Sequence, residues 1–394
     1  MSKRILVVRS IPNNLDYKGY NIQQVGLGRS FVDLGYDYDF ITFNKFEKKC
    51  KSFVFYENKG CQARWIEKPR YRFLRWGINT EICKKEFLAQ YDIIICQEYY
   101  QLESYLIARN SRNVALYSGP YYNLFLPKFL SPFYDYIIGP RLNLLVRVIF
   151  VKSVLAYDFL SRKGYTGIKN VGVALDTSRF EDVVVRPETQ VLIDYMKKNR
   201  CLLYVGALSD RKNYSLMLQI YAMLLKSVPD LKFVVIGKSV SSFGHKLFGG
   251  KDTDYEENCM KRISKSVSSG IIRVERIENP QLKYIYPLCK AFLLPSKQEI
   301  FGMVLLEAMY LGAPVVTSKN GGSMTLIGNR EEFGQIVEEF DVKQWAEAVL
   351  RYLNDESYTA RVKENGRRRV KQEFSWASIA REMLEHLKNA GYNT

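Results

Sequence analysis

The stretch that decides the fold lies at residues 295–314 and reads PSKQEIFGMVLLEAMYLGAP. An apolar run ends just before it, which predicts a buried strand, and a turn then carries Glu299 and Gly302. A helix is expected from Met303 to a stop at Gly312, because glycine commonly ends helices. The first amides of such a helix are free and lie at the positive end of its dipole. The stretch therefore predicts an anion-binding site where a strand turns into a helix.

Two carboxylates flank this predicted site. Glu307 lies about one turn into the expected helix, and Glu299 is in the loop on the other side. Gly302 between them lets the backbone approach a ligand closely. A second interpretation stays open, in which Glu299 is a solvated loop acid and Glu307 interacts only with the helix dipole.

Short apolar runs and helical periodicity alternate on both sides of this stretch. In the second half, strands are expected at residues 202–205, 232–236, 271–274, 291–294 and 314–317, with a helix at 214–226. In the first half, strands are expected at residues 5–8, 38–42, 93–96 and 114–117, with a helix at 22–34. This alternation is typical of parallel sheets covered on both faces by helices.

The chain therefore divides into two predicted α/β domains, each a Rossmann-like doubly wound parallel sheet. The first domain spans residues 1–180 and the second spans 181–374, with a polar stretch near the boundary. The terminal segment 375–394 is expected to form a helix that packs back on the first domain. Ligands of such sheets bind at the carboxyl ends of the strands.

Composition and charge exclude several classes of protein. The 394 residues are 47% hydrophobic with only 25 Gly and 12 Pro, which excludes a disordered or collagen-like chain. The seven Cys form no CxxC pair, so a reducing cytoplasm is predicted, and no apolar stretch is long enough to span a bilayer. The net charge of +17 is concentrated in residues 1–180, with 27 Lys and Arg against 15 Asp and Glu. Such an excess predicts a polyanionic or membrane-surface partner.

Several motifs in register carry a resemblance to a known family. The pair Glu299-x7-Glu307 lies within the pattern Pro-Ser-x-x-Glu-x-Phe-Gly followed by Glu-Ala-Met-x-x-Gly-x-Pro-Val-Val. This pattern resembles the nucleotide-sugar signature of family 4 glycosyltransferases of the GT-B fold. Residues 201–213 resemble that family's strand, glycine and basic phosphate-clamp loop. Residues 171–180 and 374–376 are similar to the segments that close the first domain and open the terminal helix. The resemblance implies two domains that face a cleft.

The resemblance also implies roles for individual residues. Arg211 and Lys212 would bind the donor diphosphate, Glu307 the ribose hydroxyls and Glu299 a sugar hydroxyl, with Arg211, Lys212 and Glu299 as the catalytic group. A solvated basic turn is the alternative for the two cations. The implied donor site further includes Gly206, Gly237, Ile277, Ile300, Phe301, Gly302 and Met303. The implied reaction is a retaining transfer without a covalent intermediate, with neither a cofactor nor a metal ion.

Departures from the family pattern affect the acceptor side. Ala207 stands where many members have Arg, and both His residues of the chain lie outside the first domain. The resemblance leaves Gly19, Tyr20 and Gly119 as candidates that face the acceptor. The usual acid after the late Gly-Gly pair is replaced by Thr325.

Two short acidic motifs resemble a metal-binding pattern. Asp37-Tyr-Asp39 and Asp252-Thr-Asp254 have the Asp-x-Asp spacing that holds a metal in the other major glycosyltransferase fold. A match this short arises by chance, so solvated loop acids are the favoured interpretation.

A basic aromatic segment at residues 68–76, with further Lys at 45–51, contributes to the charge of the first domain. It is compatible with a single-stranded nucleic-acid face, an interfacial membrane patch, or an ordinary basic surface with inward aromatics. An acceptor linked to a lipid diphosphate would account for the charge and for the apolar residues at 123–133 and 142–151.

These observations lead to one leading hypothesis. The sequence predicts a retaining glycosyltransferase that moves a sugar from a nucleotide-diphosphate sugar to a saccharide or lipid-linked acceptor in bacterial surface polysaccharide assembly. It is expected in the cytoplasm, with peripheral contact to the anionic inner face of the membrane and no nucleic-acid partner; its oligomeric state stays open. The alternatives are a sugar-nucleotide 2-epimerase of the same fold and a basic nucleic-acid-binding protein. A dehydrogenase is disfavoured because no GxGxxG follows the first strand.

Overall fold

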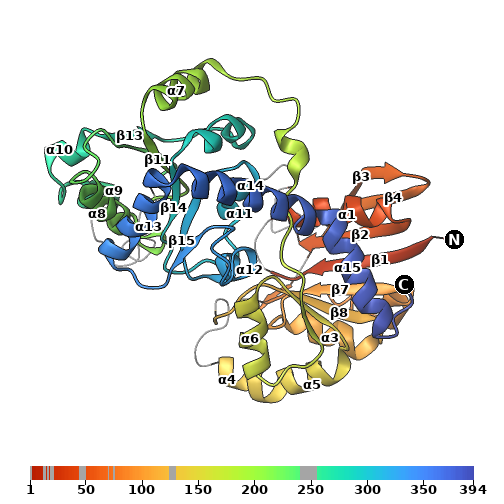
Figure 1. The fold of residues 1–394 in the computed structure, drawn as a ribbon. Coiled ribbons are helices and arrows are strands. Elements are labelled where there is room, and N and C mark those ends of the chain that lie inside the picture. Colours follow the sequence, from red (N-terminus) through yellow and green to blue (C-terminus); the bar gives the residue numbers. More distant parts are fainter. Residues whose placement is uncertain are drawn as a thin grey trace. The chain divides into compact units, whose positions relative to one another are not determined.

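The computed structural model describes residues 2–11, 15, 17, 22–43, 50–69, 71–73, 76–123, 130–239 and 255–394. The chain forms two compact units (Figure 1). Unit 1 combines Met1–Asp176 with Phe374–Thr394, and unit 2 is Thr177–Glu373. The division after Asp176 lies four residues before the boundary expected from the sequence.

Unit 1 is built on an eight-stranded sheet with the order β10-β9-β8-β7-β1-β2-β4-β3. Its neighbours pair in parallel, except that β3 runs antiparallel to β4. The central strands are almost fully buried, as the continuous apolar runs predict. The strands are β1 (Lys3–Arg9), β2 (Tyr36–Phe43), β3 (Lys51–Asn58), β4 (Cys61–Lys68), β7 (Ile93–Gln97), β8 (Val114–Ser118), β9 (Ile149–Val151) and β10 (Ile168–Asn170).

The first sheet is parallel, as predicted, except at the edge formed by β3. Strands β3 and β4 are joined by the two residues Lys59 and Gly60, both with positive φ (49° and 81°). A connection this short permits only antiparallel pairing, and two positive φ angles are typical of a type I′ hairpin turn. No strand was predicted from the sequence between residues 51 and 68, so this hairpin was missed.

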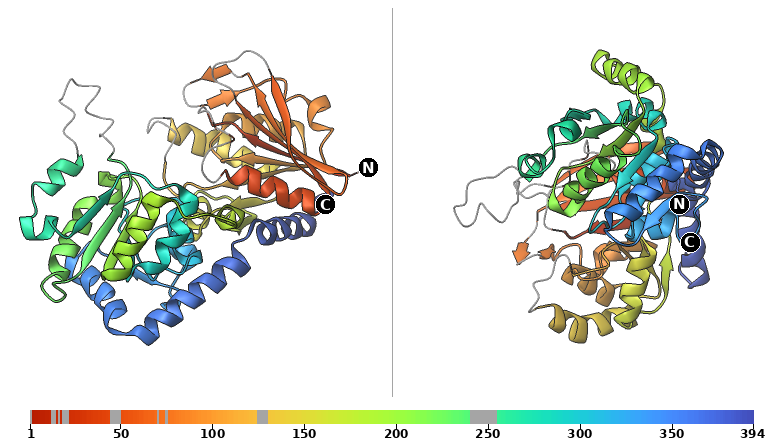
Figure 2. Two further views of the ribbon diagram at one scale, coloured as in Figure 1. Left: turned by 90° about the horizontal axis from the view of Figure 1, so that it is seen from above. Right: turned by 60° about the vertical axis from the view of Figure 1, so that its left-hand side comes forward.

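Helices cover both faces of the first sheet, and the terminal helix is among them. On one side, α1 (Gln23–Asp33) packs against α15 (Trp376–Asn389), as Figure 2 shows in red and blue. A Cβ at Gly26 would lie 2.2 Å from the ring of Trp376, so this glycine permits the close crossing. Leu175 and Ser375 form a parallel bridge next to it. The predicted return of the C-terminal helix to the first domain is confirmed.

The other elements of unit 1 pack mainly on the opposite face. Buried side chains such as Ile107, Leu142 and Leu160 join the strands in one core cluster there. The elements are α2 (Lys85–Leu88), α3 (Leu102–Asn110), α4 (Ser131–Phe133), the π-helix η1 (Tyr134–Ile138), α5 (Gly139–Leu145), α6 (Val154–Arg162) and a separate hairpin of β5 (Tyr71–Phe73) and β6 (Trp76–Ile78).

Unit 2 is a six-stranded, fully parallel sheet with the order β13-β12-β11-β14-β15-β16. The strands are β11 (Cys201–Val205), β12 (Lys232–Ile236), β13 (Ile271–Val274), β14 (Ala291–Leu294), β15 (Val315–Ser318) and β16 (Gln335–Val337). The strand order reverses between β11 and β14, which makes this pair the topological switch point. In open α/β sheets ligands bind outside the carboxyl ends of the strands at such a point.

The helices of unit 2 complete the doubly wound arrangement and confirm the predicted fold class. The helix expected from Met303 begins at that residue and ends at Tyr310. The helical elements are η2 (Thr177–Phe180), α7 (Pro187–Lys198), η3 (Asp210–Lys212), α8 (Tyr214–Leu224), α9 (Tyr255–Met260), α10 (Lys265–Ser268), η4 (Asn279–Tyr284), η5 (Tyr286–Leu288), α11 (Met303–Tyr310), α12 (Gly321–Leu326), α13 (Val342–Asn354) and α14 (Glu356–Glu373). Across the described ranges, no helix has the length and apolar character needed to cross a membrane.

Candidate functional site

The loops that follow β11 and β14 meet at the switch point of unit 2. The two strands are paired, with Leu203 opposite Phe292, so their carboxyl ends lie side by side. The amide of Lys297 donates to the carbonyl of Arg211 at 2.9 Å, and the Lys297 ammonium contacts Asp210 Oδ1 at 2.6 Å. Two segments about ninety residues apart in sequence are therefore joined at one edge of the sheet.

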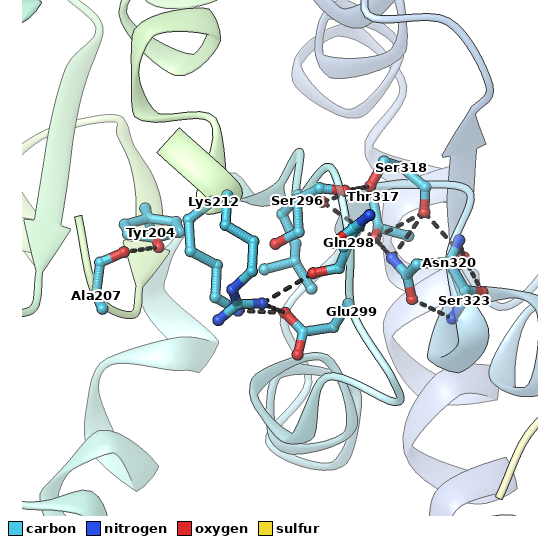
Figure 3. Close-up of polar contacts among 12 residues, drawn as sticks. Tyr204, Ala207, Lys212, Ser296, Gln298, Glu299, Thr317, Ser318, Asn320 and Ser323 are labelled. Carbon is cyan, nitrogen blue, oxygen red and sulfur yellow. Dashed lines mark hydrogen bonds and ion pairs between the residues drawn. The ribbon is translucent and has the colours of Figure 1, made fainter. Parts of the chain in front are cut away.

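A cluster of three charged side chains occupies this junction (Figure 3). The Lys212 ammonium donates to Glu299 Oε2. The Arg211 guanidinium donates to the same oxygen at 3.3 Å and to the carbonyl of Gln298 at 2.8 Å. Two cations thus share one carboxylate, which leaves a surplus positive charge beside the loop that was predicted to bind an anion.

Burial differs among the three members of this cluster. The side chains of Lys212 and Glu299 are 10% and 15% exposed, whereas that of Arg211 is 50% exposed. Burial lowers the pKa of the Lys212 ammonium, and the charge of Glu299 acts in the opposite direction. Lys212 is therefore not part of a solvated basic turn, and Glu299 is not a solvated loop acid.

The local backbone places these cations. Asp210–Lys212 form the short helix η3, and Asn213 then adopts a left-handed conformation with φ of 57° before α8 begins. The Lys212 amide donates to the carbonyl of Ser209 at 3.1 Å. This tight turn, which Asn tolerates better than most residues, directs Lys212 toward the loop after β14.

Glycines hold the Glu299 loop against its surroundings. Gly302 has φ of 77° and stands at the N-terminus of α11, where its carbonyl accepts from the amide of Leu305 at 2.8 Å. A Cβ at Gly322 would lie 1.5 Å from the carbonyl oxygen of Phe301, so α12 packs directly on the loop backbone. Asn320 caps α12 by accepting from the amide of Ser323 at 3.0 Å. The loop that carries Glu299 is thus fixed on both sides.

Glu307 is buried on α11 and its carboxyl group has no hydrogen-bond partner among the described residues. The residue is 0% exposed, and both carboxyl oxygens are buried. Burial raises the pKa of Glu307 to about 8. Because Glu307 lies beyond the first turn of α11, interaction with the helix dipole does not account for its burial. A buried polar group without partners is rare in native proteins and calls for a functional explanation.

The remaining predicted donor residues follow neighbouring strands at the same edge. Gly206 and Gly237 have φ of 152° and 148°, and a Cβ at Gly237 would lie 1.8 Å from the carbonyl oxygen of Gly206. Ile277 follows β13, and Ile300 precedes the buried Phe301 in the loop after β14. Met303 is the first residue of α11. The predicted set therefore lies along the carboxyl ends of β11, β12, β13 and β14.

Gly119, one of the residues predicted to face the acceptor, follows β8 in unit 1 and contacts residues that the sequence did not single out. Its amide donates to Glu98 Oε2 at 3.1 Å, and the Ser118 hydroxyl donates to the same oxygen at 3.0 Å. The Lys152 ammonium lies 3.5 Å from Glu98 Oε1. Glu98 is 5% exposed and has a backbone φ of 71°, which is uncommon for a residue other than Gly. Gly19 and Tyr20 lie outside the described residues.

A detectable signal for this group was present in the sequence. Glu98 and Lys152 each come one or two residues after a short apolar run. Because the carboxyl ends of parallel strands meet at one edge, polar residues at such positions become neighbours. Of the two strands, β7 was predicted, whereas the three residues of β9 are too few for a periodic pattern.

The acidic motifs weighed as metal sites have different outcomes. Asp39 is 2% exposed on β2 and accepts hydrogen bonds from Arg64 at 2.7 Å, Arg4 at 3.0 Å and the Tyr91 hydroxyl at 2.8 Å. Its oxygens are therefore committed to protein partners. Asp252 and Asp254 lie outside the described residues. Metal independence stays a prediction.

The basic aromatic segment 68–76 is only partly described. Arg70 and Arg75 lie outside the described residues, and for Arg72 only the backbone in β5 is described. Trp76 is buried and donates to the carbonyl of Tyr100 at 2.9 Å, whereas Tyr71 is 77% exposed. The interpretation with inward aromatics holds for Trp76 and not for Tyr71.

Part of the chain matches a known protein family. Residues 192–369 match the family described as Glycosyl transferases group 1. Over 186 residues, 47% of this chain and 45% of the relative, the chain is 28% identical to the capsular polysaccharide biosynthesis glycosyltransferase CapM of Staphylococcus aureus. The chain thus spans less than half the length of this relative.

Two solved structures share the whole fold. One is Escherichia coli trehalose-6-phosphate synthase bound with UDP-2-fluoro glucose, with a TM-score of 0.71, 13% identity and coverage of 98% of this chain and 99% of that one. The other is HepE of Anabaena in complex with UDP, with a TM-score of 0.70, 15% identity and coverage of 98% and 100%. At such identities the likeness shows the fold alone, and that fold is GT-B.

Proposed function

Because residues 192–369 match the group 1 glycosyltransferases, we propose that this protein transfers a sugar from a nucleotide-diphosphate sugar to a hydroxyl group of a saccharide or lipid-linked acceptor. The capsular polysaccharide role in the name of the S. aureus relative supports a place in bacterial surface polysaccharide assembly. The titles of the two solved structures, which name UDP or a UDP-sugar, support a nucleotide-sugar donor.

The observation that carries this proposal is the buried, unpartnered carboxyl group of Glu307. A vicinal diol, such as that of a ribose, presents two hydroxyl groups that can each hydrogen-bond to one carboxyl oxygen. Binding would therefore satisfy both oxygens at once and remove the penalty of burying them alone. No other ligand group named by the resemblance explains both orphaned oxygens together.

The charged cluster supplies the second part of the donor site. A diphosphate carries negative charge that Arg211 and Lys212 would neutralise, and this charge grows on the leaving oxygen as the bond to the sugar breaks. Arg211 is half exposed and keeps donors for such a ligand, while Glu299 orients the buried Lys212. The cluster is thus arranged to stabilise a leaving nucleoside diphosphate.

We propose a retaining reaction at this site, without a covalent intermediate. The bond between the sugar C1 and the phosphate oxygen breaks, and the acceptor oxygen forms a bond to C1 from the same face. The proton of the acceptor hydroxyl passes to the departing phosphate oxygen, so no side chain has to act as the base. The roles left to the protein are to position the sugar and to stabilise the developing charge. We propose that the reaction needs no metal ion and that the enzyme acts in the cytoplasm.

The proposal is tested by nucleotide binding. Isothermal titration with UDP, GDP, ADP and CMP, and with their sugars, should find one base that binds the wild type. The substitution Glu307→Gln should weaken that binding by about 10- to 100-fold, because it removes one strong acceptor from the diol contact. The control Glu347→Gln changes a carboxylate on the exposed face of α13 and should bind like wild type. A wild-type protein that binds none of these compounds, or a Glu307→Gln variant with unchanged affinity, contradicts the donor-site assignment.

A further inference from the structure

The helical segment from Ser131 to Leu145 presents an exposed apolar face. Elements α4, η1 and α5 follow one another without a break over this segment, on the outside of unit 1 (Figure 1). Tyr136 is 82% exposed and Leu144 is 86% exposed. We call this face the exposed stripe; its apolar members are Pro132, Phe133, Tyr136, Ile137, Pro140, Leu144 and Leu145.

The exposed stripe belongs to a helix that is firmly anchored in the core. Tyr134, Ile138 and Leu142 alternate with its members and are at most 8% exposed. The exposed pairs repeat every four residues, which in a regular α-helix would turn the stripe by about 40° at each repeat. The π turn of η1 places more residues in a turn and so helps to keep the pairs on one face. The exposure is therefore built into the fold.

Exposed apolar side chains are concentrated here. Twelve large hydrophobic side chains are exposed in the described part of the chain, and five of them belong to this segment. Isolated exposed apolar residues are normal on a protein surface, but a contiguous group marks an interaction site.

Cations surround one end of the exposed stripe. Leu144 and Leu145 line a surface hollow of about 830 Å³, and its lining also contains four exposed cations and no acidic residue. Arg141 lies on the stripe itself and is exposed. The acid of the segment, Asp135, is paired with Lys163. The four cations of the hollow are Lys85, Arg109, Arg112 and Arg147.

We propose that the exposed stripe and the cationic hollow dock unit 1 on an anionic lipid bilayer. Apolar side chains on one face of a helix enter the boundary between headgroups and acyl chains, and adjacent Lys and Arg bind anionic headgroups. A two-fold contact between two copies of the chain would place the same patch against itself and bring its cations together, which disfavours self-association through this face. This surface is distinct from segment 68–76, where the sequence predicted membrane contact.

The test is binding of the full-length chain to vesicles, without nucleotide, so that its outcome does not depend on the proposed donor chemistry. Co-sedimentation should show binding to vesicles with 30 to 50% phosphatidylglycerol and at least tenfold weaker binding to pure phosphatidylcholine. The variant Tyr136→Ser/Leu144→Ser should bind the anionic vesicles at least tenfold more weakly. The variant Arg109→Gln/Arg141→Gln should lose about 20- to 30-fold at low salt, since each basic residue near such a surface contributes about fivefold.

Matched controls come from unit 2. Val184 and Val191 are 83% and 72% exposed, so Val184→Ser/Val191→Ser removes similar apolar surface elsewhere. Lys197→Gln/Lys198→Gln removes two exposed charges from α7. Both controls should bind vesicles like wild type, and thermal unfolding should show that all four variants are folded.

Three results would overturn the proposal. The first is wild-type protein that does not bind the anionic vesicles or binds both vesicle types equally. The second is a loss in the unit 2 controls as large as in the stripe variants. The third is a wild-type dimer in sedimentation velocity that the stripe variant converts to a monomer, which would assign the face to a second copy of the chain.

Discussion

The two sheets of this protein carry polar groups at the same kind of position but assemble them differently. In unit 2 the loops that follow β11 and β14 meet at the carboxyl ends of these strands, where Arg211, Lys212 and Glu299 form one cluster. In unit 1 the corresponding edge brings together Glu98 and Lys152, which follow strands β7 and β9. The members of the first cluster belong to motifs of several residues, whereas the second leaves only single polar residues after short apolar runs as its signal.

The largest expected effect lies in the cluster of unit 2. Lys212→Ala should lower kcat by about 100- to 1,000-fold, because it removes a buried cation positioned for charge that develops in the transition state. Transfer rates measured at saturating donor, once the donor is known, check this. Lys226→Ala, an exposed lysine just after α8, is the control and should keep wild-type turnover. A Lys212→Ala enzyme with normal kcat would show that the cluster is only structural.

A smaller effect is expected at the edge of unit 1. Glu98→Ala should lower the free energy of unfolding by about 3 kcal/mol, because it leaves the Lys152 ammonium and the Gly119 amide without their buried acceptor. Urea unfolding measures the loss. Nucleotide affinity should stay at the wild-type value, since all three partners of the Glu98 carboxylate belong to unit 1. A change in nucleotide affinity as large as that of Glu307→Gln would contradict the prediction that Glu98 stabilises unit 1 without affecting nucleotide binding.

Counted per pH unit, the smallest expected effect is a pH dependence that sets Glu307 apart from the paired acids. Its pKa is raised by burial from 4.5 to about 8, so the folded protein keeps this proton after the unfolded chain has lost it. The resulting stabilisation is complete below about pH 4.5 and is lost as pH rises toward 8, by up to about 1.4 kcal/mol per pH unit. Urea unfolding of wild type and Glu307→Gln from pH 5 to 8 should show the slope only in wild type. Equal slopes would contradict the buried, unpartnered state.

The sequence predicted more of unit 2 than of unit 1. Strands β12, β13 and β14 begin and end at the predicted residues, because each is a compact apolar run between polar turns. The hairpin of β3 and β4 was missed, since most of β3 is exposed and polar residues interrupt the apolar residues of β4. Strands of three residues, such as β9 and β16, are too short for a periodic pattern to reveal.

The candidate site divides in the same way. Arg211, Lys212, Glu299 and Glu307 were predicted because local turns and one helix place them, and such geometry is encoded by nearby residues. The sequence could not show that Glu299 is shared by two cations or that Glu307 has no partner. Those properties depend on tertiary burial, as does the unusual backbone of Glu98.

The return of α15 to unit 1 has a consequence for the order in which the protein can fold. Unit 1 is discontinuous, because Trp376 packs on Gly26 after the whole of unit 2 has intervened in the chain. During synthesis, the whole of unit 2, which is one continuous segment that ends at Glu373, is made before α15. Unit 1 lacks this helix until then. The nascent first unit therefore keeps this face of α1 uncovered until α15 has left the ribosome.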